Sequence, residues 1–138
     1  MEYKLLLVGE SGVGKSTWCK RLRTGEFEPM HIATIGVEVH PIRLQTNIGE
    51  VIFKVWDCAG RYAYGGLREG YYVGGDCAII MGNNQPNEDL REHYWNKRLR
   101  SVLQDQPIHY VDRNMNNIQQ PLLDMVRTLS GNDNIVLV

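Results

Sequence analysis

The chain has 138 residues, of which 43% are hydrophobic and 22% are charged, the composition of a single globular domain spanning residues 1–138. A net charge of −1 argues against nucleic acid or an anionic membrane as a partner, since both favour a basic excess. Its three cysteines, Cys19, Cys58 and Cys77, form no CxxC pair, so we expect neither a disulfide framework nor a thiolate metal cage. With no membrane span or lipid motif in the sequence, we expect a soluble monomer, cytoplasmic or nuclear or both.

Strands and helices alternate along most of the chain. Short aliphatic runs that stop at a glycine or a turn predict strands, and apolar periods of about 3.6 residues predict helices. In chain order the expected elements are strand 4–8, helix 15–24 ending at Gly25, strands 37–44 and 51–57, strand 77–81, helix 88–103, strand 108–111 and helix 121–130 ending at Gly131. This alternation favours an α/β fold with a mostly parallel sheet of about five strands and helices on both faces.

Two features interrupt the alternation. Strands 37–44 and 51–57 follow each other across a turn at 46–50, which predicts an antiparallel hairpin. Six glycines within residues 60–75 predict a mobile segment, because glycine permits backbone shapes that regular elements exclude.

The glycine-rich loop after the first strand carries the clearest motif. The sequence from Gly9 to Thr17 reads GESGVGKST and fits the P-loop pattern GxxxxGK[ST]. In this pattern backbone N–H groups wrap nucleotide phosphates, Lys15 neutralises their oxygens and Ser16 reaches Mg2+. The alternative, a chance glycine loop, fits the position between a strand and a helix poorly. The predicted phosphate-binding residues are Glu10, Ser11, Gly12, Val13, Gly14, Lys15, Ser16 and Thr17.

A carboxylate is expected at the same edge of the sheet. Asp57 ends the strand 51–57, and a carboxylate in that position can hold Mg2+ through water. Taken alone, Asp57 could equally cap a helix or turn. Its place after a strand favours the metal.

Several stretches around these motifs form a recognisable series. They read Thr24-Gly-Glu-Phe-Glu28, Ala33-Thr-Ile-Gly-Val-Glu-Val-His-Pro41, Trp56-Asp-Cys-Ala-Gly60 and Gly65-Gly-Leu-Arg-Glu-Gly-Tyr-Tyr72. With them the chain resembles the Ran family of the Ras superfamily of small GTPases, densely over residues 3–82 and more loosely beyond. The resemblance implies a small GTPase-like fold that binds GTP or GDP with Mg2+ and acts in nuclear transport. It also implies partners such as transport receptors and exchange factors.

The resemblance implies roles for residues outside the loop as well. Thr34 would bind Mg2+ and the γ-phosphate, Gly60 would donate its amide to that phosphate, and Phe27 would stack on the base. The alternatives are a plain strand threonine for Thr34 and a core phenylalanine for Phe27. The expected metal ligands are Ser16, Thr34 and Asp57.

The residue after Gly60 departs from the family, which has a glutamine there. Arg61 has no acceptor atom with which to orient a water, so we expect slow hydrolysis of GTP. Arg61 could instead neutralise transition-state charge, and a solvated arginine is the third interpretation. The expected catalytic residues are Lys15, Thr34, Gly60 and Arg61.

The C-terminal third departs further. It lacks the NKxD and SAK motifs, so we interpret the chain as a truncated GTPase-like domain whose choice of base is weak. Asp112, Asn114, Asn116 and Asn117 are candidates to contact a base, although polar turn residues are the stronger interpretation. Two alternatives remain: a base-tolerant protein that also binds ATP, and a non-catalytic interaction module that presents the family's switch surface.

The remaining histidines and tryptophans predict no further site. His31, His40, His93 and His109 show no metal-ligand spacing, so we expect no metal beyond Mg2+. Trp18, Trp56 and Trp95 are expected to pack within the fold, given their places in strands and helices.

Overall fold

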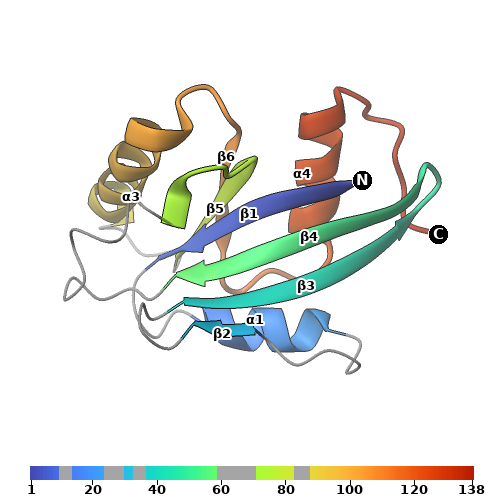
Figure 1. Cartoon of the computed structure of the whole chain (residues 1–138), viewed down its shortest axis with the longest axis horizontal. Coiled ribbons are helices and arrows are strands. Elements are labelled where there is room, and N and C mark those ends of the chain that lie inside the picture. The colour runs from blue at the N-terminus through green and yellow to red at the C-terminus, as the bar shows by residue number, and fades with distance from the viewer. Residues whose placement is uncertain (10–13, 24–29, 33–36, 59–70, 83–87) are drawn as a thin grey trace.

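A sheet with helices on both faces forms the protein (Figure 1). The computed structural model describes residues 1–9, 14–23, 30–32, 37–58, 71–82 and 88–138. The strands are β1 (Glu2–Val8), β2 (Met30–Ile32), β3 (Val37–Thr46), β4 (Gly49–Cys58), β5 (Cys77–Gly82) and β6 (Ile108–Asp112), and the helices are α1 (Lys15–Leu22), α3 (Glu88–Leu103) and α4 (Gln120–Ser130). The sheet order is β2-β3-β4-β1-β5-β6.

The central strand β1 determines the parallel part of the sheet. It pairs in parallel with β4 on one side and with β5 on the other, and β6 continues the parallel order beyond β5. Strand β3 runs antiparallel to β4, as the predicted hairpin requires, and to β2. The mostly parallel α/β fold is therefore confirmed. A sixth strand, β2, joins the five that the sequence predicts, and its three residues are too few to show a pattern of their own.

Two apolar cores lie on opposite faces of the sheet. Alternate residues of β1 serve each core, Leu5 and Leu7 on one face and Leu6 and Val8 on the other, and none of them is exposed. Helices α1 and α4 cover the first face, and α3 covers the second. The covering side chains include Trp18 and Cys19 from α1, Leu122, Met125 and Val126 from α4, and Trp95, Leu99 and Leu103 from α3.

The ends of several elements differ from their predictions by one or two residues. Helix α1 ends at Leu22 and not at residue 24, because Arg23 takes an extended backbone at φ −70° and ψ 143°. The hairpin turn is tighter than the predicted 46–50, since Thr46 already pairs with Gly49. The end of α4 is as predicted, with Gly131 in the left-handed conformation at φ 68°.

The residues after α4 return to the hairpin. Thr46 forms an antiparallel bridge with Leu137, and Asn47 N donates to Val136 O at 3.0 Å. Val138 N donates to Gln45 O at 3.1 Å. These bonds tie the chain beyond α4 to the β3–β4 turn.

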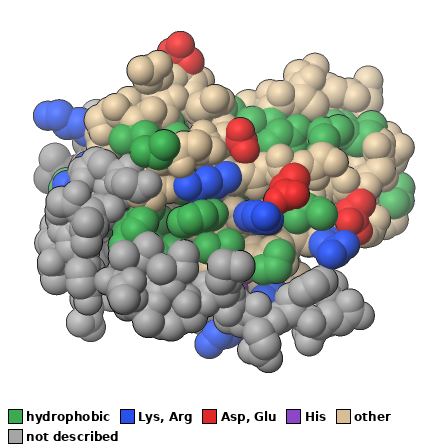
Figure 2. Space-filling model, viewed as in Figure 1, with side chains coloured by type: hydrophobic (Ala, Val, Ile, Leu, Met, Phe, Trp, Pro, Cys, Tyr) green, Lys and Arg blue, Asp and Glu red, His purple; other side chains and the backbone are tan. Residues whose placement is uncertain are grey.

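Opposite charges are interleaved on the face seen in Figure 2, where Lys and Arg side chains lie among Asp and Glu with apolar side chains between them. Lys54 pairs with Glu2 at 2.7 Å and Arg43 with Glu50 at 2.9 Å, all four being partly or fully exposed. Surface pairs of this kind contribute little to stability. Among the described helices, none combines the length and the apolar character needed to cross a bilayer.

Gly9 and Gly49 both have a positive φ but differ in how closely other atoms approach them, and the comparison tests the packing of Gly9 against β5. A Cβ at Gly9 would run into the backbone carbonyl oxygen of Met81, whereas a Cβ at Gly49 would meet nothing within 4 Å. We expect Gly49→Ala to lower the free energy of unfolding by about 1–3 kcal/mol through its φ of 112° alone. Gly9→Ala should cost clearly more, because β5 must also move. Urea denaturation of both variants measures the difference, and equal losses would contradict the close approach.

Candidate functional site

The predicted phosphate loop lies between the end of β1 and the start of α1. Gly14 caps the helix in the left-handed conformation, at φ 98° and ψ 20°, and its carbonyl accepts the first helical hydrogen bond, from Trp18 N at 2.9 Å. The first turn of α1 carries no acidic residue. The N–H groups and the positive dipole end of the helix are therefore not neutralised by an acidic side chain of that turn, which suits an anion.

Lys15 reaches back across this loop. Its side chain is buried, with 7% of its surface exposed, and Nζ donates to Gly9 O at 2.9 Å. An ammonium group is costly to bury, so the backbone carbonyl at the start of the loop holds the charge in place. The structure thus places the Lys15 ammonium at Gly9, the residue at which the predicted phosphate loop begins.

Ser16 and Asp57, predicted as metal ligands, are brought together. Ser16 Oγ donates to Asp57 Oδ2 at 2.5 Å, joining the first turn of α1 to the end of β4. The register of β4 against β1 places Asp57 opposite Leu7, two residues before Gly9, and so beside the loop. A hydroxyl and a carboxylate are ligands that suit Mg2+.

The electrostatics of Asp57 also suit a cation. Burial raises the pKa of this carboxyl above its usual range, against the hydrogen bond from Ser16 and the charge of Lys15, which lower it. Only 7% of the residue is exposed, so little water remains to solvate a charge. The residues present therefore fit a phosphate chain and Mg2+: Lys15 and the helix terminus for the anion, Ser16 and Asp57 for the metal.

The other predicted site residues divide into two groups. Thr17 is described and lies exposed on α1. Eight lie outside the described residues, so their predicted roles stay predictions: Glu10, Ser11, Gly12, Val13, Phe27, Thr34, Gly60 and Arg61. The predicted mobile segment lies outside them as well over residues 59–70.

Two residues near Asp57 were not predicted to belong to any metal site. Cys19 from α1 and His40 from β3 lie so that a ligand atom of each falls within 4.8 Å of the other and of an Asp57 oxygen. The sequence predicts no thiolate cage and no metal beyond Mg2+, so this group of potential ligands was not predicted. Sequence spacing could not reveal the group, because its three members come from three elements. The alternation along β3, which puts Glu38 and His40 on one face, was the only available signal.

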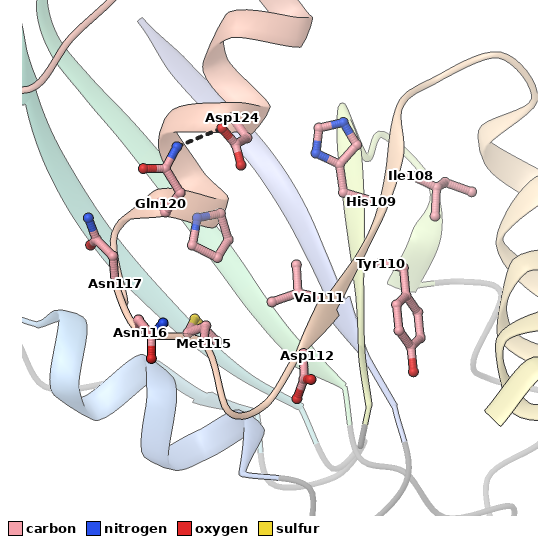
Figure 3. A pocket seen from close by; sticks show the side chains of 11 residues that line it. Ile108, His109, Tyr110, Val111, Asp112, Met115, Asn116, Asn117, Gln120 and Asp124 are labelled. Atoms are coloured by element: carbon pink, nitrogen blue, oxygen red, sulfur yellow. Dashed lines mark hydrogen bonds between the residues drawn. The ribbon is translucent and has the colours of Figure 1, made fainter. Parts of the chain in front are cut away.

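Two cavities flank the segment after β6. The smaller, of about 320 Å3, adjoins the phosphate loop and is lined by Gly14, Thr17, Trp18, Arg21, Met81, Arg113, Asn114 and Met115. The larger, of about 690 Å3, lies between β6 and the start of α4 (Figure 3), and neither cavity is lined by Lys15, Ser16 or Asp57. Of these two cavities, the smaller is the one whose lining includes Gly14, at the start of α1.

The polar residues after β6 form turns. Asn114 N donates to Asp112 Oδ1 at 2.9 Å, and Gln119 N donates to Asn117 Oδ1 at 3.0 Å. Side chains that accept from a backbone N–H two residues on are typical of Asx turns. The interpretation of Asp112 and Asn117 as turn residues is therefore confirmed, while Asn114 also faces the smaller cavity.

The sequence matches one family of known domains. The family described as "Ras of Complex, Roc, domain of DAPkinase" matches residues 4–119, from β1 to the residue before α4. The matched range includes the whole predicted phosphate loop as well as Ser16 and Asp57. The match does not single out the Ran family within the Ras superfamily.

Because Asp57 is buried, we expect its charged carboxylate to lower the free energy of unfolding at neutral pH. A carboxyl whose pKa is raised in the folded protein favours folding as the pH falls towards that pKa and opposes it at neutral pH. In EDTA at pH 7 we expect Asp57→Asn to raise the free energy of unfolding by roughly 1 kcal/mol, because the amide still accepts from Ser16 but carries no charge. Urea denaturation measures this. Asp76→Asn is the control, since Asp76 accepts from Lys4 N at 2.8 Å but is only half-buried. A loss of stability in Asp57→Asn would contradict the prediction.

Proposed function

The chain belongs to the Roc family of the Ras superfamily, and from this premise we propose that it binds GTP and GDP with Mg2+ and hydrolyses GTP slowly as a molecular switch. The observation that carries the proposal is the hydrogen bond from Ser16 to Asp57 beside the buried Lys15. These three side chains come from the start of α1 and the end of β4. Their chemistry, one cation and two oxygen ligands, is what a Mg2+–triphosphate needs.

Each residue has a separate task in this proposal. Lys15 binds phosphate oxygens, the N-terminus of α1 adds N–H donors, and Ser16 with Asp57 holds Mg2+, which supplies charge neutralisation when bound. We propose that Thr34 and Gly60 respond to the third phosphate, Thr34 through the metal and Gly60 through its amide. A segment held only by that phosphate is released when it leaves, which is how a switch reports its nucleotide.

The smaller cavity supports a place for the base. It begins at Gly14 and Thr17 on α1, so a nucleoside attached to phosphates at the loop reaches it. Arg113 and Asn114 line its far side, and an amide can both donate to and accept from a base edge. We propose that Phe27 adds stacking. Stacking and a single amide discriminate bases weakly, so ATP is the alternative ligand.

A second candidate function is a non-catalytic interaction module with the switch surface of the Ran family. It is favoured by Arg61, which lacks the acceptor needed to orient a water. Its partners would be transport receptors or exchange factors of the nuclear-transport type, met in the cytoplasm or nucleus. Nucleotide-dependent binding to such receptors would support this function, and binding that ignores the nucleotide would count against it.

Nucleotide binding is tested by removing the buried cation. We expect Lys15→Ala to weaken binding of Mg2+–GTP at least about a hundredfold, or about 2.8 kcal/mol, since it removes the charge aimed at the phosphates. Lys20→Ala is the matched control, because Lys20 lies exposed on the same helix. Calorimetry on nucleotide-free protein measures both, and unchanged affinity in Lys15→Ala would refute the site.

Hydrolysis is tested at Arg61. We expect Arg61→Gln to raise the single-turnover rate, because the amide restores an acceptor that fixes the attacking water. A fall in rate with unchanged nucleotide affinity would instead show that Arg61 stabilises charge in the transition state. An unchanged rate would favour the interaction module, whose switch segments report the nucleotide without chemistry.

A further inference from the structure

Three potential metal ligands lie close together beside the predicted phosphate site. Cys19 lies on α1, His40 on β3 and Asp57 on β4, and one ligand atom from each falls within 4.8 Å of the other two. The first two residues have no exposed surface, and Asp57 has 7%. The cluster lies on the sheet face that α1 and α4 cover, so it is enclosed by the core and not part of a solvated patch.

His40 is the unusual member of this cluster. Among the described residues, neither of its ring nitrogens has a hydrogen-bond partner, although the side chain is fully buried. Nε2 faces two carboxylates, at 3.3 Å from Glu38 Oε2 and 4.0 Å from Asp57 Oδ2. Buried polar groups are nearly always satisfied, so a buried imidazole aimed at oxygen ligands without a bond indicates a missing partner between them.

The strand register adds a second reason for a cation. Glu38 and Asp57 are directly opposite each other in the β3–β4 pair, and His40 lies two residues along β3 on the same face. Directly opposed like charges destabilise a sheet, and the cost grows when one of them is buried. A positive ion next to Asp57 and His40 would relieve that repulsion.

We propose that Cys19, His40 and Asp57 form a site for a divalent transition metal of the zinc class, which shares Asp57 with the proposed Mg2+ site. A sulfur, an imidazole nitrogen and a carboxylate oxygen are the ligands that zinc takes in proteins, whereas Mg2+ prefers oxygen alone. Metal–ligand distances of about 2.0–2.3 Å place tetrahedral ligands about 3.5 Å apart, so the side chains must close by roughly 1 Å. Water or the Glu38 carboxylate completes the coordination.

Asp57 would then belong to two sites. The oxygen that accepts from Ser16 is also the one 4.0 Å from His40 Nε2, so a metal held by Cys19 and His40 draws Asp57 away from Ser16. Zinc and Mg2+–nucleotide should therefore exclude each other. This consequence rests on the proposed function, whereas the zinc-class site itself does not.

Cobalt(II) tests the site directly, because a cobalt–thiolate bond gives a charge-transfer absorption that oxygen and nitrogen ligands alone do not. The full chain, stripped with EDTA, freed of nucleotide and kept reduced, is titrated with Co2+ and then with Zn2+. We expect the absorption to appear and Zn2+ to abolish it. No absorption would overturn the site.

Three variants assign the ligands. Cys19→Ala should abolish the charge-transfer band, and His40→Phe, which keeps a buried ring but no nitrogen, should weaken Zn2+ binding at least about tenfold. Cys77→Ala is the matched control, since Cys77 is equally buried but outside the cluster, and it should keep the band. Circular dichroism confirms that each variant folds. If Cys19→Ala does not fold, Zn2+ binding by His40→Phe tests the site instead. A band that survives Cys19→Ala, or full Zn2+ affinity in His40→Phe, would overturn the proposal.

A competition experiment separates this site from the proposed function. GDP with Mg2+ should lower the apparent affinity for Zn2+ in the wild-type chain. Binding of both without competition would overturn the sharing of Asp57. Zinc binding without any GDP binding would leave the metal site standing and refute the nucleotide function, and GDP binding without zinc would do the reverse.

Discussion

The second half of strand β1 is enclosed on every side, and the rest of the fold is arranged around that constraint. Its residues from Leu5 to Val8 have no exposed surface, so both faces need helices and both edges need strands. Parallel pairing with β4 and β5 brings the carboxyl ends of three strands to one edge. Gly9, the start of α1 and Asp57 lie together at that edge.

The sheet edge at which β1 and β4 end carries buried charged and polar side chains, which an apolar core normally excludes. Lys15, His40 and Asp57 are all buried, and burial lowers the pKa of His40 as it raises that of Asp57. Each is less favourable than an apolar residue of its size would be, so this region gives up stability that ligands can restore. Both proposed ligands would therefore stabilise these buried groups, the nucleotide through phosphate and Mg2+ and the other ligand through a softer metal.

Local pattern predicted what depends on local physics. Aliphatic runs located the central strands, Gly131 located the end of α4, and the loop motif led to Lys15 and to the meeting of Ser16 with Asp57. What escaped prediction depends on register. Strand β2 exists because β3 offers an edge to three residues, and Cys19 meets His40 only once α1 has docked on the hairpin. No spacing along the chain encodes such contacts, since each needs two elements already in place.

The return of the chain beyond α4 to the hairpin bears on biosynthesis. Leu122, Met125 and Val126 cover the face that β1, β3, β4 and β5 have shared since much earlier in translation, and Leu137 then closes on Thr46. During synthesis, α1 therefore covers only part of this apolar face until α4 emerges. The part of the face that α4 covers is exposed until then, and exposed apolar surface of this kind favours aggregation of a folding intermediate.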